Sequence, residues 1–306
     1  EEVSKLRREM NVLSDPVRKV LLANKGRDGD VSNVPKPFAR WDFEKDANDS
    51  VRGLKGILKG GARLEKGALV VNGRDAFLET EVIRTELRAK TLEAWVQLDT
   101  FEQRGGGAIT LQALNGVVFD SIVFAERRKG AWMAGSDGFR RTKEFNGSPA
   151  WEASQRPVHL AIVYGADGRI TGYRDGRAYG DSYQSSGPIH FKAGQAVVSF
   201  GVRHLPPGGN RMLEGRIVEA RLYDRALTPG EIAASAKSLN NYVSEEDVIR
   251  SLTSEQRRQY NDMKGKVAAL ETKLSKLEEF GDAKGKDPLI ELAHAIFNFK
   301  EFIYVR

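Results

Sequence analysis

A long middle stretch of short β-type runs constrains the fold of this chain more than any other feature. Between residues 38 and 235, alternating or β-branched runs recur and are separated by Gly, Asn and Asp. No helix-length segment alternates with them, which disfavours a parallel α/β sheet. We therefore expect a mainly β, antiparallel sandwich over residues 38–235, with ten or more strands. The runs read ARWDF, ALVVNG, DAFLETEV, KTLEAWVQLD, GAITLQAL, VVFDSIVFAE, PVHLAIVYG, ITGYRDG, AVVSFGVR and GRIVEARLYD.

A helical segment precedes the sandwich, in residues 1–25. Its apolar residues Val3, Leu6 and Met10 are spaced three and four apart, as on one face of an amphipathic helix. Residues 14–16 (SDP) combine capping residues with a proline that suits a first helical position, so we expect a second short helix to begin there. Residues 26–37 (GRDGDVSNVPKP) read as a linker.

A cleaner heptad pattern follows the sandwich, in residues 244–280, where Thr253 or Ser254 can cap a helix. Because the N-terminal helix has the same period, we expect the two to pair as a short antiparallel coiled coil that carries the middle domain. Self-association through the same seam is the alternative and would make the chain a homo-oligomer. The heptad positions are Tyr260, Met263, Val267, Leu270, Leu274 and Leu277.

The composition narrows the classes of function. The 306 residues include no cysteine, which excludes disulfides, thiolate metal sites and cysteine nucleophiles within this sequence. The surplus of six positive charges is spread along the chain without a basic tract, so we expect no nucleic-acid partner. No apolar run approaches the roughly 20 residues that a membrane-spanning helix needs, so we expect no membrane insertion.

Several motifs of the middle region occur in a familiar order. They are WDF at residues 41–43, DS at 49–50, GAL at 67–69, NG at 72–73, TLEAWV at 91–96 and GRIVEARLYDRAL at 215–227. In order and spacing they resemble the laminin-G-like, concanavalin A-like jelly-roll family. The resemblance implies two antiparallel sheets, one of them concave, and a binding role.

The last residues carry a second resemblance. We expect residues 287–306 to form a C-terminal helical segment. Within it, LAHAIFN at residues 292–298 and KEFIY at residues 300–304 look like the closing segment of a domain of unknown function. That domain occurs in large planctomycete multidomain proteins with cytochrome-c-like segments upstream and a laminin-G-like insertion. The resemblance implies that this chain is the C-terminal part of a longer protein that is exported, periplasmic or at the cell surface. The missing upstream domains would then be partners of this chain.

Glycoside hydrolysis is the enzymatic use of such a fold that the sequence can test. It needs two carboxylates about 5 to 9 Å apart on a concave strand. The Glu-x-Asp-x-x-Glu pattern of retaining jelly-roll glycosidases is absent, and its nearest approach, Glu245-x-Asp247, meets Arg250 where the second glutamate belongs. Glu79 and Glu81 alternate to one face, where paired acids usually serve solvation. We therefore expect a chain that is not an enzyme.

Calcium is the best candidate for a bound metal. Asp46, Asn48 and Asp49 place three hard oxygen ligands within four residues of a turn, and relatives in the resembled family often bind calcium in such loops. The alternative is an Asx turn, in which the same oxygens accept hydrogen bonds from their own backbone. Val218 stands where relatives often have an acid, which counts against the metal.

Candidate ligand-binding residues gather in three loop regions. Recognition on a jelly roll requires rigid aromatic surfaces and planar hydrogen-bond donors at a rim or concavity. The long loop VRHLPPGGNR is hard to explain by connection alone. Packing is the alternative for each aromatic residue, and for Trp132 the two readings weigh equally. The candidates are Trp132 and Asp137 in GAWMAGSDGF, Arg203, His204, Asn210 and Arg211 in the long loop, and Tyr179 in YRDGRAYGDSY.

Together these patterns predict a noncatalytic module that binds a glycan or a protein partner for a larger envelope protein. One alternative is a structural spacer whose loops bind nothing. The other is an enzyme that acts on polysaccharide with a jelly-roll fold.

Overall fold

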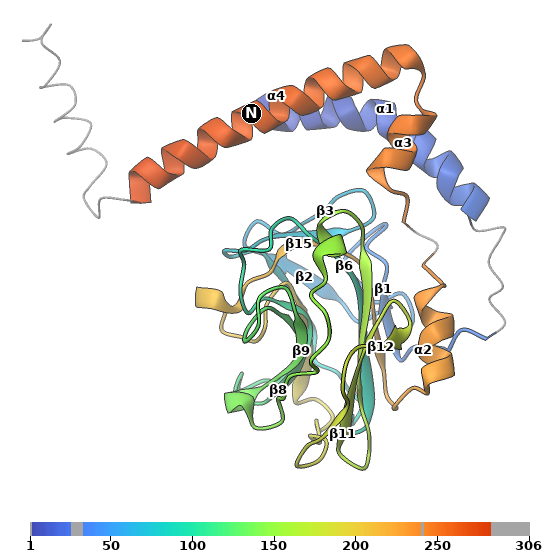
Figure 1. Cartoon of the computed structure of the whole chain (residues 1–306), viewed down its shortest axis with the longest axis vertical. Coiled ribbons are helices and arrows are strands. Elements are labelled where there is room, and N and C mark those ends of the chain that lie inside the picture. The colour runs from blue at the N-terminus through green and yellow to red at the C-terminus, as the bar shows by residue number, and fades with distance from the viewer. Residues whose placement is uncertain (1, 26–32, 240–241, 283–306) are drawn as a thin grey trace, which may run out of the picture. The chain divides into compact units, whose positions relative to one another are not determined.

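A computed structural model describes residues 2–25, 33–239 and 242–282, with side chains up to residue 274. Its internal contacts divide the chain into two compact units. One unit joins the two ends of the sequence, Glu1–Leu21 with Val243–Arg306, and the other is Leu22–Tyr242 (Figure 1). The predicted C-terminal segment at 287–306 and most of the predicted linker, residues 26–32, lie outside the described residues.

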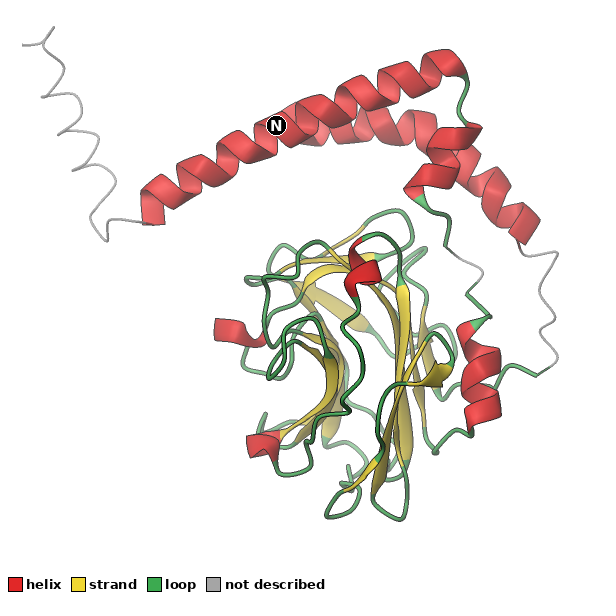
Figure 2. Cartoon of the chain, viewed as in Figure 1, coloured by secondary structure: helices red, strands yellow, loops and turns green. Residues whose placement is uncertain are grey.

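The middle unit is a sandwich of two antiparallel sheets, as Figure 2 shows. Among the described residues, the nine-stranded sheet has the order β12-β11-β10-β6-β15-β4-β3, with β1 paired to β15 and β13 paired to β11. The six-stranded sheet has the order β2-β5-β14-β7-β8-β9. The strands are β1 (Ala39–Trp41), β2 (Gly56–Lys59), β3 (Arg63–Leu64), β4 (Leu69–Asn72), β5 (Phe77–Thr80), β6 (Lys90–Leu98), β7 (Gly107–Ala113), β8 (Phe119–Phe124), β9 (Trp132–Ser136), β10 (Val158–Tyr164), β11 (Arg169–Arg174), β12 (Arg177–Ala178), β13 (Tyr183–Gln184), β14 (Ala196–Phe200) and β15 (Glu214–Tyr223).

The period of two along each strand places the core between the sheets. In β6, Leu92, Ala94 and Val96 join the main apolar cluster, whereas Glu93 and Trp95 point to the outer face. That outer face is buried as well, because helix α2 (Pro229–Ala236) and the residues after it cover it. This double burial explains why the central strands read as nearly continuous apolar runs. The prediction of a mainly β antiparallel sandwich is confirmed.

Helix α2 begins as its sequence indicates. The Thr228 side chain accepts a hydrogen bond from the Glu231 backbone N–H, and the Glu231 carboxylate accepts one from Thr228 N–H. Pro229 takes the first helical position, where its missing N–H costs nothing. Three short 3₁₀ helices, Asp137–Phe139, Trp151–Ser154 and Gly209–Arg211, complete the sandwich unit as the structure describes it.

The terminal helices correct two predictions. Helix α1 (Glu2–Lys25) runs through Pro16 without restarting, since the apolar face continues across it to Val17. The heptad segment is divided into α3 (Glu245–Ser251) and α4 (Ser254–Asp282). The Thr253 side chain accepts from Gln256 N–H and Gln256 accepts from Thr253 N–H, so a capping box starts a new helix there.

The helices from the two ends of the sequence share one apolar cluster. Met10 of α1, Leu252, and Tyr260 and Val267 of α4 are buried in it. Arg7 Nη2 lies 2.6 Å from Glu271 Oε1, and α1 and α4 run in opposite directions (Figure 1). The knobs-into-holes geometry of a coiled coil stays a prediction. Among the described helices, none combines the length and the apolar character needed to span a bilayer.

Candidate functional site

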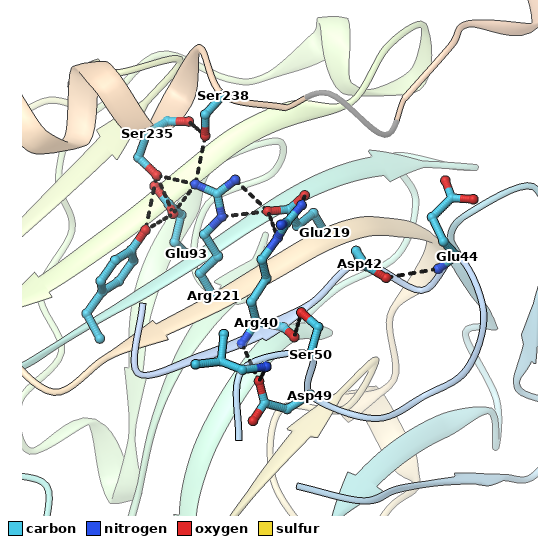
Figure 3. A network of polar contacts seen from close by, with 12 residues as sticks. Arg40, Asp42, Glu44, Asp49, Ser50, Glu93, Glu219, Arg221, Ser235 and Ser238 are labelled. Atoms are coloured by element: carbon cyan, nitrogen blue, oxygen red, sulfur yellow. Dashed lines mark hydrogen bonds and ion pairs between the residues drawn. The ribbon is translucent and has the colours of Figure 1, made fainter. Parts of the chain in front are cut away.

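The richest polar network lies on the outer face of the nine-stranded sheet, beneath α2 (Figure 3). Glu93 of β6 is its centre: Oε1 is 2.7 Å from His159 Nε2, while Tyr223 and Ser235 hydroxyls donate to Oε2 at 3.0 and 2.8 Å. Burial by itself raises the pKa of Glu93, but the hydrogen bond and charge of His159, with the charge of Arg221, outweigh it and lower the pKa. Glu93 is therefore an ionised carboxylate inside the protein.

A second carboxylate, Glu219 of β15, continues the network. Arg221 Nε donates to Glu219 Oε1 at 2.5 Å, and Arg40 donates to both carboxylate oxygens at 2.9 Å. Arg221 also donates to Ser235 at 2.7 Å and to Ser238 at 2.8 Å. These bonds connect α2 and the segment that follows it to the sheet. Figure 3 shows these side chains converging below the helix.

The two glutamates are the residue type of a glycosidase catalytic pair, but a substrate has no access to them. Both are 0% exposed, and each is held by arginine or hydroxyl groups of the protein. A sugar bond cannot reach them while α2 is in place, so the network fastens the helix to the sheet. Neither glutamate was predicted to have a role. The signal in the sequence was a charged residue inside an otherwise apolar run that is fully buried.

The predicted calcium loop uses its oxygens within the protein. Asp46 Oδ1 accepts from Asn48 N–H at 2.8 Å, and Asn48 Oδ1 accepts from Gly56 N–H at 3.1 Å. Buried Asp49 accepts from three backbone N–H groups, those of Arg40, Val51 and Arg52. These hydrogen bonds are those of Asx-type turns, the alternative to a metal site. Calcium binding by this loop stays a prediction. In the described part of the chain, no three acidic or histidine side chains group as metal ligands.

Trp132 packs inside the sandwich, which is one of the two roles that the sequence left open for it. It lies in β9, is 2% exposed, and packs against Phe124 in the main apolar cluster. Because β9 is buried along its whole length, the indole offers no open face on which a sugar ring can stack. Asp137 lies just after this strand, where its carboxylate accepts from Arg141 Nη1 at 3.0 Å.

The long loop brings its four predicted residues together, and their side chains contact other parts of the protein. These residues are Arg203, His204, Asn210 and Arg211. Arg203 donates to Glu126 and to Asn210 Oδ1, and its pKa is lowered to about 10 by burial and by the charge of Arg211. His204 stacks on Phe119 with ring centroids 4.6 Å apart. Arg211 donates to the Pro206 carbonyl at 2.9 Å.

This loop lies against the outer face of the six-stranded sheet. Thr110 of β7 donates to the carbonyls of Val202 and Arg203, each at 3.0 Å, and Leu205 N–H donates to Gln112 Oε1 at 2.7 Å. The loop residues therefore serve as packing and hydrogen-bonding partners of the sheet. Their role in ligand binding stays a prediction.

Tyr179 lies at a different place, at the edge of the nine-stranded sheet. Its hydroxyl donates to the Ser148 carbonyl at 2.9 Å and accepts from Trp132 N–H at 3.3 Å. A surface depression of about 470 Å³ opens beside it. The lining residues are Ser148, Arg174, Asp175, Arg177, Ala178, Tyr179 and Gly180.

The turn between β11 and β12 shapes this depression. Asp175 and Gly176 have φ of 50° and 76°, which is the geometry of a tight two-residue hairpin turn. The turn pairs Arg174 directly with Arg177 across the strands. Arg174 covers Tyr179, with its guanidinium carbon 5.1 Å from the ring centroid, and donates to the Ser148 carbonyl at 2.8 Å. The site thus presents guanidinium and hydroxyl groups.

The comparison with protein families decides what kind of sandwich this is. A model described as the concanavalin A-like lectin/glucanases superfamily, laminin G type, matches residues 72–233, more than half of the chain. The chain belongs to this superfamily. A comparison with curated proteins gave no match.

Solved structures with this superfamily's fold resemble the chain at low sequence identity. One is domain 4 of AbnA, an extracellular family 43 arabinanase from Geobacillus stearothermophilus, in complex with arabinotriose. It is 21% identical, with a TM-score of 0.53, and the match covers 66% of this chain and 98% of that domain. Trypanosoma rangeli sialidase in complex with a difluorinated sugar analogue is 16% identical, with a TM-score of 0.51. That match covers 67% of this chain and only 33% of the sialidase.

One residue that lines the depression, Tyr179, was predicted from the sequence as a ligand-binding residue. Ser148, Arg174 and Arg177 were not predicted. The dipeptide Asp175-Gly176 marked the turn, and an arginine on each side of such a turn was the signal that could have indicated the site. Trp151, which is 49% exposed beside the segment that carries Ser148, was not predicted either.

Proposed function

We propose that this chain is a noncatalytic, glycan-binding module of a larger exported protein. The superfamily contains lectins and glucanases by its description, and the AbnA domain has been solved with arabinotriose. Both facts support sugar recognition as the use of the sandwich. The observation that carries the proposal is the depression beside Tyr179, whose arginine and serine groups suit the hydroxyl-rich surface of a sugar.

The arrangement of carboxylates favours binding over hydrolysis. A glycosidase needs two acids that flank the bond to be cleaved. Glu93 and Glu219 are buried under α2, and Glu79 forms an ion pair with Lys59. In the depression, Asp175 is bound by Arg156 Nη2 at 2.6 Å. Release of reducing sugar from any polysaccharide by the purified chain would overturn this part of the proposal.

A structural spacer is the second candidate, and one observation favours it. The loop residues Arg203, His204 and Asn210 are engaged with the protein itself, as a connecting element requires. A spacer binds no glycan, which separates the two candidates experimentally.

The test is isothermal titration of the full chain with a panel of neutral and acidic oligosaccharides. We expect binding to at least one member, and loss of that binding in Ala178→Trp, which fills the depression from its exposed lining residue. Ala166→Trp, in the exposed turn before β11, is the matched control and keeps wild-type affinity. If no member of the panel gives a heat of binding, and affinity electrophoresis also detects no binding, the proposal is contradicted and the spacer is favoured.

The proposal extends to the location of the protein and to its neighbouring domains. We propose that the chain acts in an exported, periplasmic or cell-surface protein whose other domains lie upstream, as the planctomycete resemblance implies. The extracellular arabinanase supplies a parallel in which such a sandwich is one domain of a longer chain. Pairing of α1 with α4 as a coiled coil, within one chain or between two, belongs to this proposal and is supported by their shared apolar cluster.

A further inference from the structure

We infer that the depression beside Tyr179 selects acidic sugars, and that Arg177 is the residue that binds their carboxylate or sulfate group. The inference rests on the proposed glycan-binding function and names its ligand class. It is carried by the placement of two arginines across one tight turn.

The turn forces two like charges together. Arg174 and Arg177 are direct cross-strand partners, flanking Asp175 and Gly176. Like charges at directly opposite positions destabilise a strand pair. A bound anion between or beside the two guanidinium groups would remove that repulsion.

The two arginines differ in how far the protein already satisfies them. Arg174 donates to the Ser148 carbonyl and to Ser148 Oγ at 2.8 and 3.0 Å, and its Nε lies 3.4 Å from Glu152 Oε1. The protein therefore already holds the guanidinium group of Arg174 in place. Arg177 is exposed, and within the described part of the chain it has no hydrogen-bond or ion-pair partner.

The carboxylate of the turn does not neutralise Arg177. Asp175 is turned to Arg156, which holds both of its oxygens, at 3.2 and 2.6 Å, and to the His159 N–H at 3.2 Å. Of the charged groups that line the depression, Arg177 is thus the one left to act on a ligand. A guanidinium group binds a carboxylate or sulfate through two parallel, charge-assisted hydrogen bonds, and a neutral sugar lacks the opposite charge that strengthens them.

The experiment compares oligogalacturonate with its full methyl ester, which has the same sugar ring and linkage without the charge, and adds a sulfated galactan oligomer. Each is titrated into the full chain as wild type, Arg177→Gln and Arg88→Gln. Arg88 is also exposed and carries the same charge, so its variant controls for net charge. Circular dichroism and the melting temperature confirm that each variant is folded.

We expect wild type and Arg88→Gln to bind an acidic oligomer more tightly than the methyl ester, and Arg177→Gln to lose on the order of tenfold in affinity for the acidic oligomer alone. A response to galacturonate or to the sulfated oligomer identifies which anion the site takes. Equal affinity of wild type for the acidic and esterified sugars, or an unchanged Arg177→Gln, overturns the inference and leaves glycan binding standing. The absence of binding to every sugar overturns the proposed function as well.

Discussion

At the scale of single residues, Asp49 shows how one buried carboxylate can organise a turn. Its two oxygens accept hydrogen bonds from three backbone N–H groups and so hold the turn together. We expect Asp49→Ala to lower the free energy of unfolding by about 2–4 kcal/mol, because three backbone N–H groups in part-buried hydrogen bonds lose their acceptor. Urea denaturation measures this.

The control for Asp49 is Asp46→Ala, three residues away. Asp46 is exposed, and its side chain accepts one hydrogen bond, from Asn48. We expect its loss to cost about 1 kcal/mol or less. Equal destabilisation by the two variants would contradict the structural role assigned to Asp49.

The lowered pKa of Glu93 predicts how the free energy of unfolding changes at acidic pH. Its pKa is lowered in the folded protein, because His159 and Arg221 outweigh the effect of burial. A lowered folded-state pKa gives stability that is present above the unfolded-state pKa of about 4.3 and is lost as pH falls through the folded-state pKa. We expect the free energy of unfolding to fall as pH decreases below about 4.3, and to fall less steeply in Glu93→Gln. Parallel profiles would refute this assignment.

The sequence identifies residues that could bind a ligand, but it does not tell which of them are exposed in the folded protein. Trp132 and Trp151 both follow glycine- or proline-containing segments, yet the first is buried and the second is half exposed. The difference arises because β9 is covered on both faces, and that coverage depends on how distant strands and loops pack. Arg177 could not be singled out for the same reason: its lack of a partner depends on where Asp175 turns.

At the scale of elements, the capping box of α2 offers a defined test. The hydrogen bond from Arg225, with those of Thr228, lowers the pKa of Glu231 to about 2. We expect Thr228→Ala to cost about 1 kcal/mol at pH 7. In the wild type the contribution of Glu231 is present above about pH 4.3 and fades as pH falls toward 2. Urea denaturation at pH 7 and pH 3 measures both effects, and an undiminished cost at pH 3 would argue against the carboxylate.

Helix α1 carries a proline that its packing tolerates. Pro16 is exposed and lacks the N–H that an interior helical residue donates. We expect Pro16→Ala to stabilise the helical unit by about 1–3 kcal/mol, since the missing hydrogen bond is restored and the ring is removed. Thermal unfolding followed by circular dichroism at 222 nm is the measurement. A lower melting temperature would mean that the proline ring itself contributes packing.

The element pattern could be predicted where local chemistry decides it. The Thr228–Glu231 capping box and the alternating runs of the sandwich needed no distant partner. The expected restart at Ser14-Asp15-Pro16 was wrong because the apolar seam on both sides of Pro16 packs into one cluster, which outweighs the local stop signal. The break after Ser251 was missed within the 244–280 segment, although Thr253 was recognised as a cap.

At the scale of the whole molecule, each compact unit has its own apolar cluster. Met10, Tyr260 and Val267 belong to the helical unit, whereas the main cluster lies entirely within the sandwich. We therefore expect a fragment of residues 22–242 to fold alone and to unfold in one cooperative transition. Its urea midpoint should match the sandwich transition of the full chain. A fragment without a cooperative transition would show that the sandwich depends on the terminal helices.

The pairing of β1 with β15 has a consequence for how such a domain can be combined with others. Ala39 lies opposite Leu222, so the first and last strands of the sandwich are immediate neighbours. A polypeptide that enters by one and leaves by the other returns almost to its starting point. Such a domain can therefore be inserted into a surface loop of another protein without separating the two ends of that loop.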